Sequence, residues 1–331
     1  MTRPRRVAVM LNPRAQGVTS ARLAWFRAHV AAGDLFVPDS VARAAEVVRD
    51  VAARGYEVLC TGGGDGTFML AAAALCELAP AAMPALMPLR LGTGNAVHDV
   101  CGSSRPTRRG LAHDLARAAD PREPAAPLRL LEVDGRLTQF AGVGLDADWA
   151  ADYAWLIKRH VGTGPLLPLV RGAPGYALTA LGLTIPRLVR RPFVQMKLIA
   201  RGGASRLDAE GRSVGELADG EVLYEGPATM ASMSTVASYS AGFAYFRHVD
   251  RIGDAFEVKV AIASAYQVVR HARRVLGGGH DPARVLDFAA RGLTVELPVA
   301  TRYHVGGDVL PPAAAFSART SRHAVPVLRR R

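Results

Sequence analysis

Residues 56–67 read YEVLCTGGGDGT, and this stretch decides how the first part of the chain folds. Tyr56–Thr61 is a short apolar run with β-branched and aromatic residues, which predicts a buried strand. Three consecutive glycines, an aspartate, another glycine and a threonine follow, and an apolar helix is predicted from about Thr67 to Leu78. The glycines allow positive φ angles and let backbone N–H groups approach an anion, so this order of elements predicts a phosphate-binding loop.

The same alternation of strands and helices extends to both sides of the loop. Arg6–Leu11 reads as a strand that ends at Asn12-Pro13, Val41–Arg54 as an amphipathic helix and Ala85–Leu89 as a further strand. Strands separated by helices of this length predict a parallel sheet with helices on its faces. We therefore expect an α/β domain at the start of the chain.

Beyond a proline-rich stretch at residues 121–127 the pattern changes to short strands. The predicted strands are 128–133, 137–141, 193–200, 221–224, 228–233, 255–262, 293–297 and 301–305. This density predicts a β-sandwich. The expected domains are an α/β domain over 1–127 and a β-sandwich over 128–309, with 310–331 as a candidate segment to return to the first domain. An apolar segment, Gly164–Leu188, is expected to be a structural helix beneath the sandwich rather than a lipid-facing patch.

Asp65 stands in the middle of the glycine loop, and its charge needs an explanation. A carboxylate beside phosphates is repulsive unless it holds Mg²⁺ or takes a proton from an attacking hydroxyl. The alternative is a tight turn in which Asp65 only caps a helix. The loop is neither a Walker A loop nor a G-x-G-x-x-G loop, because the required Gly-Lys-Ser/Thr and glycine spacing are missing.

A second glycine loop, LGTGN at Leu91–Asn95, follows the strand at Ala85–Leu89. Its threonine and asparagine supply hydroxyl and amide groups for phosphate or for the first loop. A third element, Asn12-Pro13 with Gly17, lies at the end of the first strand. Loops after the carboxyl ends of parallel strands converge at one crevice, so the three are expected to surround one nucleotide.

These motifs resemble the diacylglycerol kinase catalytic family, which includes bacterial lipid kinases, sphingosine kinases and ceramide kinases. The resemblance rests on Asn12-Pro13, Gly62–Thr67 and Gly92–Asn95, with weaker matches at Gly142–Ala147 (GVGLDA) and Ala241–Val258. It implies an α/β nucleotide domain of the three-layer type found in NAD kinases and phosphofructokinases, followed by a β-sandwich that shapes a lipid site. The implied reaction transfers the γ-phosphate of ATP, with Mg²⁺, to the hydroxyl of a diacylglycerol or sphingoid-like lipid.

The resemblance also implies roles for individual residues. Asp65 would be catalytic, as a Mg²⁺ ligand or a base, and Asp308 would assist proton removal. The implied nucleotide-binding residues are Asn12, Pro13, Gly62, Gly63, Gly64, Asp65, Gly66, Thr67, Gly92, Thr93, Gly94 and Asn95. Some bacterial members hold a structural Mg²⁺ at an acidic turn, for which Asp250, Asp254 and Glu257 are the candidates here, Asp254 and Glu257 first.

Several positions depart from the family pattern and keep alternatives open. Met69 and Leu70 stand where the family has Asn-Glu, and Pro38 stands where many relatives have a threonine. Gly306-Gly307-Asp308 replaces Asp-Gly-Glu, and Asp308 is one methylene shorter than glutamate. The alternatives are a catalytically impaired nucleotide- or lipid-binding relative and an NAD kinase, which shares the GGDGT loop.

The formal charge of +12 indicates an anionic partner. Arginines cluster at 3–6, 105–109, 187–191 and 329–331, and each Lys or Arg near an anionic bilayer contributes about 1 kcal/mol. Nucleic acid is set aside, because aromatic residues are only 6% and no nucleic-acid motif is present. The three cysteines have no metal or disulfide spacing. We expect a cytoplasmic protein in transient contact with membranes; a homodimer is common among such relatives.

Overall fold

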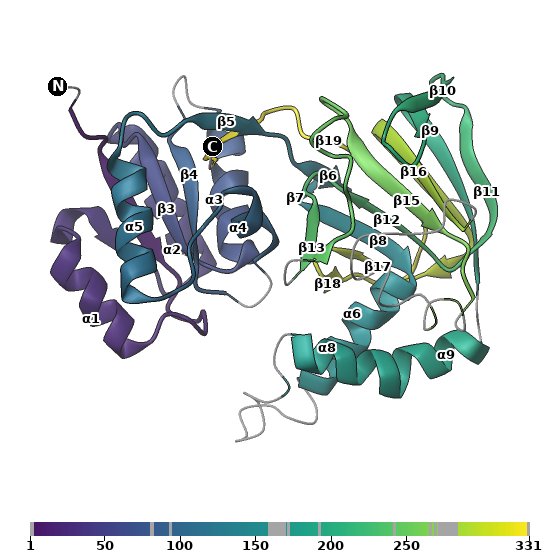
Figure 1. Cartoon of the computed structure of the whole chain (residues 1–331), viewed down its shortest axis with the longest axis horizontal. Coiled ribbons are helices and arrows are strands. Elements are labelled where there is room, and N and C mark those ends of the chain that lie inside the picture. Colours follow the sequence, from purple (N-terminus) through teal and green to yellow (C-terminus); the bar gives the residue numbers. More distant parts are fainter. Residues whose placement is uncertain are drawn as a thin grey trace. The chain divides into compact units, whose positions relative to one another are not determined.

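The computed structural model describes residues 3–79, 83–92, 95–157, 170, 173–190, 193–240, 243–264, 267, 270 and 284–329. The chain divides into two compact units (Figure 1). One consists of Met1–Arg129 together with Arg322–Arg331, and the other of Leu130–Ser321. We call them the N-terminal unit and the C-terminal unit.

The N-terminal unit is built on a six-stranded sheet in the order β2-β1-β3-β4-β20-β5. Its strands are β1 (Val7–Leu11), β2 (Leu35–Phe36), β3 (Val58–Gly63), β4 (Ala85–Arg90), β5 (Ala125–Leu128) and β20 (Val325–Leu328). Its helices are α1 (Ser20–His29), η1 (Ala32–Asp34), α2 (Val41–Ala53), α3 (Asp65–Leu78), α4 (Ala96–Val100) and α5 (Arg108–Ala119). The strands are parallel except for β5, which runs antiparallel to β20.

Helices cover both faces of this sheet (Figure 1). Val9 and Leu11 of β1 share a buried cluster with Phe26 of α1 and Leu111 of α5. Successive side chains of a strand point to opposite faces, so the equally buried Met10 lies on the other face. There α2 and α3 pack against each other, and each contacts the sheet. The result is the predicted three-layer α/β arrangement.

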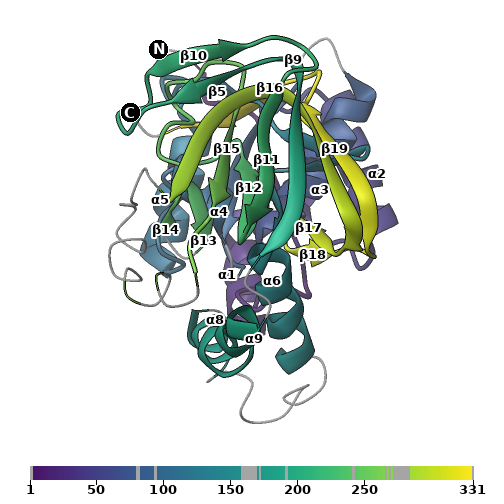
Figure 2. The same ribbon diagram turned by 90° about the vertical axis from the view of Figure 1, so that its right-hand side faces the viewer.

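The C-terminal unit is dominated by a single twelve-stranded sheet, and every strand pairing in it is antiparallel (Figure 2). Its strands are β6 (Leu131–Val133), β7 (Arg136–Thr138), β8 (Phe140–Gly144), β9 (Val194–Leu207), β10 (Ser213–Leu217), β11 (Val222–Ala228), β12 (Met230–Ser234), β15 (Phe256–Ala261), β16 (Val285–Thr301), β17 (Tyr303–Val305), β18 (Asp308–Val309) and β19 (Ala313–Thr320). The short strands β13 (Ser238–Ser240) and β14 (Phe243–Ala244) form a separate pair.

The long strand β16 pairs with β15, β19 and β9, and the sheet closes around one apolar core. That core takes side chains from strands as far apart in the sheet as β17 and β6, for example Tyr303 and Val133. A sheet whose halves share one core is sandwich-like. The predicted fold class, an α/β domain with a parallel sheet followed by an antiparallel β domain, is therefore confirmed.

The C-terminal unit also carries helices α6 (Leu145–Trp155), α8 (Ala173–Thr179), the π-helix η3 (Ala180–Thr184) and α9 (Ile185–Arg190). The described part of Gly164–Leu188 is helical as predicted, but one side of it is exposed instead of lying beneath the sandwich. Leu178 is 52% exposed and Leu181 68% exposed, while the opposite side of the helix packs on α6. Among the described residues no helix is long and apolar enough to cross a bilayer. Cys60, Cys76 and Cys101 are all free thiols.

Candidate active site

The glycine loop begins inside strand β3 rather than after it. Gly62 and Gly63 end β3, Gly64 is the N-cap of α3, and Asp65 is the first helical residue. None of these three glycines has a positive φ angle, so the expectation about φ is wrong here. Close packing requires glycine at two of these positions instead: a Cβ on Gly62 would lie 2.3 Å from Leu11 Cδ2, and one on Gly63 would lie 2.2 Å from Thr67 Oγ1.

The two glycine loops meet backbone to backbone. A Cβ on Gly92 would lie 2.0 Å from the Cα of Gly64, a distance that no side chain tolerates. Leu91 N–H donates a hydrogen bond to the carbonyl of Gly63 at 3.1 Å. The loops after the neighbouring parallel strands β3 and β4 therefore converge as the sequence predicts.

The carboxylate of Asp65 fastens the first loop to the helix after the second. Its Oδ2 accepts from the N–H of Ala96 and its Oδ1 from the N–H of Val97, both at 3.0 Å. These N–H groups open α4, where the helix leaves them without intrahelical partners. Asp65 thus caps a helix, as in the simpler interpretation, but the helix is α4 rather than its own α3.

His98 lies behind this carboxylate and is fully buried. Its Nε2 is 3.1 Å from the carbonyl of Leu89, and its Nδ1 is 3.7 Å from Asp65 Oδ1. Burial alone would raise the pKa of Asp65, but His98 and the two backbone N–H groups outweigh it and hold that pKa below its ordinary value of 3.8. Asp65 is therefore ionised at neutral pH.

The third predicted element also reaches the loops. Asn12 Nδ2 donates to Thr67 Oγ1 at 3.1 Å, and Asn12 N–H donates to the carbonyl of Gly62 at 2.8 Å. Gly17 N–H donates to the carbonyl of Leu91 at 2.9 Å. Pro13 is exposed in the turn directly after Asn12. Loops after β1, β3 and β4 are therefore joined by hydrogen bonds.

The second loop is described only in part. Thr93 and Gly94 lie outside the described residues. Asn95 has a left-handed backbone with φ of 59°, and its Nδ2 donates to the carbonyl of Gly92 at 2.9 Å. Its Oδ1 is buried without a hydrogen-bond partner among the described residues.

A pocket of about 300 Å³ opens beside these loops. It lies at the N-terminal ends of α2 and α3, which are the positive ends of the helix dipoles. Its lining consists of Met10, Asn12, Arg14, Pro38, Asp39, Ser40, Val41, Ala44, Gly66, Thr67 and Leu70. It therefore combines apolar walls with amide, hydroxyl and guanidinium groups and the carboxylate of Asp39, and its volume is at the lower end for small-molecule sites. A hollow of about 330 Å³ in the C-terminal unit, beside β9 and β10, includes none of the predicted site residues.

Asp308 belongs to the C-terminal unit. It begins β18 directly after the Gly306-Gly307 turn that joins β17 to β18, and it is exposed.

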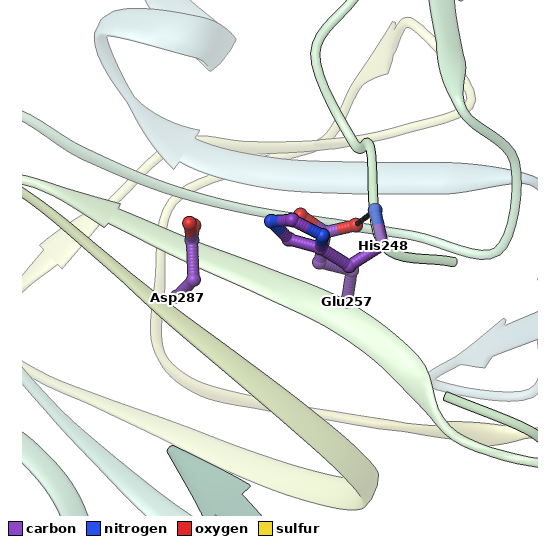
Figure 3. A group of neighbouring side chains, drawn as sticks. All are labelled: His248, Glu257 and Asp287. Carbon is purple, nitrogen blue, oxygen red and sulfur yellow. Dashed lines mark hydrogen bonds between the residues drawn. The ribbon is translucent and has the colours of Figure 1, made fainter. Parts of the chain in front are cut away.

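Of the predicted structural metal pair, only Glu257 belongs to a group of three potential ligands in the described part of the chain. Glu257 is fully buried on β15, and within the described residues it groups with His248 and Asp287 rather than with Asp254 (Figure 3). Its Oε2 accepts from the N–H of His248 at 2.8 Å. The ammonium of Lys259 lies 2.9 Å from Glu257 Oε1 and 2.6 Å from Asp287 Oδ1. A lysine already supplies the positive charge there, so these residues do not fit a magnesium site.

Sequence reasoning missed His98 and the N–H groups of Ala96 and Val97. The only signal was a short polar-apolar segment directly after GTGN, which could have been read as a helix whose N-terminus needs an acceptor. It also missed the burial of Lys259. This lysine alternates with the apolar Val258 and Val260 on β15, and such alternation is typical of an exposed position.

Comparison with known proteins agrees with the motifs. Residues 6–122 match the model of the diacylglycerol kinase catalytic domain. A presumed diacylglycerol kinase from Bacillus anthracis str. Sterne superposes with a TM-score of 0.67 at 16% identity, covering 100% of this chain and 99% of that one. A diacylglycerol kinase from the same strain gives 0.61 at 13% identity, covering 100% and 98%. These structures share the fold. No curated protein matches the chain significantly.

The family resemblance is thus confirmed for the segment that holds both glycine loops. Residues 6–122, which contain both glycine loops, match the diacylglycerol kinase catalytic domain, as the motifs predict.

Proposed function

We propose that the protein transfers the γ-phosphate of ATP to a hydroxyl group of a lipid of the diacylglycerol or sphingoid type. The observation that carries the proposal is the convergence of three strand-end loops beside a pocket at two helix N-termini. Backbone N–H groups and helix dipoles in such a place favour a polyphosphate. Phosphoryl transfer needs mainly positioning and charge neutralisation, which this arrangement supplies.

The site also suits Mg²⁺. This ion usually binds through one or two carboxylates together with phosphate oxygens and water. Each oxygen of Asp65 accepts one N–H and keeps a second lone pair, and the side chain is 15% exposed. We propose that Asp65 would hold the ion, which neutralises phosphate charge when bound.

Asp308 is our candidate for the group that takes the proton of the lipid hydroxyl. It is exposed and its backbone is fixed in a hairpin. A carboxylate one methylene shorter than the expected glutamate reaches less far, so we expect its position to matter more than in relatives with Asp-Gly-Glu.

Gly66 offers a clean test of the nucleotide pocket. It lines the pocket, a Cβ built on it meets no heavy atom within 4 Å, and its φ is not positive. Gly66→Val therefore fills the pocket without disturbing the fold. We expect the thermal shift caused by ATP and Mg²⁺ to be lost, with a loss of affinity of at least about tenfold. Gly33→Ala, equally unhindered but in η1, is the matched control.

The reaction itself is tested with labelled ATP against a panel of diacylglycerol, sphingosine, ceramide and NAD⁺. Phosphorylation of a lipid by the natural chain but not by Gly66→Val supports the proposal. Phosphorylation of NAD⁺ alone would identify an NAD kinase instead. Binding of ATP and Mg²⁺ without turnover on any acceptor would identify a catalytically impaired relative. Undiminished ATP binding by Gly66→Val would place the nucleotide elsewhere.

We also propose that the helix at Ala173–Arg190 makes contact with an anionic lipid surface. Leu178, Leu181 and Val189 are exposed by 52%, 68% and 67%, and the exposed Arg190 lies beside them. Apolar side chains flanked by arginine suit the headgroup region of a bilayer.

This surface is tested by co-sedimentation with vesicles of phosphatidylglycerol and phosphatidylcholine. The double variant Leu178→Ser/Leu181→Ser is expected to lose most of the binding. Val299→Ser, at a position of β16 that is 76% exposed, is the control and keeps it. Equal binding by the natural chain and the double variant would rule this surface out.

A further inference from the structure

A buried chain of hydrogen bonds runs from helix α6 to the turn that precedes Asp308. His304 of β17 is fully buried, and its Nε2 lies 3.0 Å from Oδ2 of Asp146. Its Nδ1 accepts a hydrogen bond from the N–H of Gly307 at 3.3 Å. Because Nδ1 must keep its lone pair in order to accept, the neutral ring carries its hydrogen on Nε2 and donates it to Asp146.

The strand register brings these groups together. Gly142 of β8 pairs with His304 on one side and with Ser232 of β12 on the other. Ser232 Oγ donates to Asp146 Oδ2 at 2.6 Å. A Cβ on Gly142 would lie 2.0 Å from Asp146 Oδ2 and 3.0 Å from His304 Nε2, so only glycine leaves room for this contact. Asp146 lies in the first turn of α6, where the helix dipole favours a negative charge.

The Gly306-Gly307 turn, where this series of hydrogen bonds ends, needs contacts that hold its conformation. Gly306 and Gly307 have φ angles of 62° and 90°, and a two-residue hairpin turn of type I′ requires positive φ at both positions. Two consecutive glycines have the widest backbone freedom of any pair. Their conformation in the folded protein therefore depends on the contacts they make, of which the bond from Gly307 to His304 is one.

We propose that His304, oriented by Asp146, positions Asp308 through the Gly306-Gly307 turn. The inference rests on the proposed function, in which Asp308 takes a proton from the lipid hydroxyl. His304 acts only through the turn, so it is a positioning residue. A general base has to lie within hydrogen-bond reach of the proton that it removes, and a displacement of about 1 Å can cost about a hundredfold in rate.

Two substitutions separate the two contacts of His304. His304→Gln keeps an amide N–H near the position of Nε2 for Asp146 but loses the acceptor for Gly307. We expect kcat for the lipid to fall by about tenfold or more with KM for ATP unchanged. His304→Asn keeps an oxygen near the position of Nδ1 and is expected to restore most of kcat. Equal losses in both variants would overturn the assignment.

A double-substitution cycle separates positioning from general damage. In a chain that already carries Asp308→Ala, His304→Gln should lower kcat no further, because the group that it positions is gone. The same fold loss in both backgrounds would show that His304 is merely structural. Val309→Ala, which removes packing from the same hairpin without touching the hydrogen bonds, is the matched control and should leave kcat within about twofold.

A readout without turnover keeps the inference separate from the proposed function. The ¹⁵N shifts of the His304 ring in the labelled natural chain should report a hydrogen on Nε2, and the Gly307 amide should exchange faster in His304→Gln. A hydrogen on Nδ1 would overturn the link even if the protein phosphorylates lipids. The expected tautomer in a protein without lipid kinase activity would instead leave the turn assignment standing and remove the function.

Discussion

The carboxylate of Asp65 accepts one backbone N–H on each oxygen, from Ala96 and Val97, and so holds two loops together. Removing it leaves these N–H groups without that partner, at a cost of about 1–3 kcal/mol for each group that water does not reach. Loss of activity in Asp65→Ala is therefore not proof of a role in chemistry. A variant that keeps the loops joined is needed to separate the two roles.

Lowering the pH should weaken the hydrogen bonds by which Asp65 joins the two loops. The pKa of Asp65 is lower in the folded protein than its ordinary value of 3.8, so its contribution to stability is complete above that value and is lost as the pH falls through the folded pKa. Urea unfolding midpoints between about pH 5 and pH 2.5 should fall more steeply for the natural chain than for Asp65→Asn. Parallel slopes in the two proteins would contradict the lowered pKa.

Gly92→Ala should separate the two loops. The added Cβ would lie 2.0 Å from the Cα of Gly64, and neither backbone is free to yield as a flexible side chain would. We expect destabilisation of about 1–3 kcal/mol in urea unfolding and a loss of the thermal shift by ATP. Gly33→Ala, with no heavy atom within 4 Å of its Cβ, should change stability by no more than about 0.5 kcal/mol. Similar values for the two variants would refute the close contact.

The glycine loop shows what a single sequence can and cannot supply. Strand, glycines and helix predict correctly where the loop lies, because they follow from local pattern. One predicted reason for the glycines, positive φ angles, was wrong. They stand next to Thr67 and Gly92 in space, and such approaches depend on how β3 and β4 pair.

A row of polar side chains crosses the antiparallel sheet on the face opposite its apolar core. Its members follow from register: His304 pairs with Gly142, Gly142 with Ser232, Ser232 with Lys259, and Lys259 with Asp287. No pattern within one strand predicts this row, because its polar side chains come from four strands, with Gly142 of β8 between the first two. These polar residues have the spacing of exposed strand positions in the sequence, but in the structure they are buried and neighbour one another.

Lys259 is expected to be the costliest residue of that row to lose. It is fully buried between Glu257 and Asp287, and removing one partner of a buried ionic group costs about 3–5 kcal/mol. We expect Lys259→Met to lower the free energy of unfolding by that amount at pH 7. Lys197→Met breaks the exposed pair with Glu225 and should cost at most about 1 kcal/mol. A small effect of Lys259→Met would show that its charge is not what balances the two carboxylates.

Elements with clear periodicity were predicted well, and those without it were not. Strand β3 and helix α2 follow their apolar patterns closely. Strand β19 was missed because alanine dominates it, and alanine has little preference for strands. The exposed helix at Ala173–Arg190 was judged buried because an apolar run with few charges gives no contrast between faces.

The N-terminal unit is formed from two segments that are far apart in the sequence. Strand β20 comes from the C-terminal end of the chain yet lies between β4 and β5 in the N-terminal sheet. Val325, Val327 and Leu328 are fully buried there. The sheet that carries the strand-end loops is therefore built from two separate segments of the polypeptide.

A chain that stops at Arg322 should lose the cooperative unfolding of the N-terminal unit, because β4 and β5 lose the strand between them. Hydrogen exchange is the measurement: amides of β3 and β4 should exchange much faster than in the natural chain. A chain that stops at Arg329 keeps β20 and is the control. Protection of β4 in both truncated chains would show that the sheet holds without β20.

This placement of β20 has a consequence during synthesis. The ribosome releases β1, β3 and β4 early, but the strand that completes their sheet follows only after the whole C-terminal unit has been synthesised. Until then the edge of β4 offers unpaired N–H and C=O groups that invite wrong partners. The N-terminal unit therefore cannot complete its sheet until the C-terminal unit has been translated, and the exposed edge of β4 needs protection during that time.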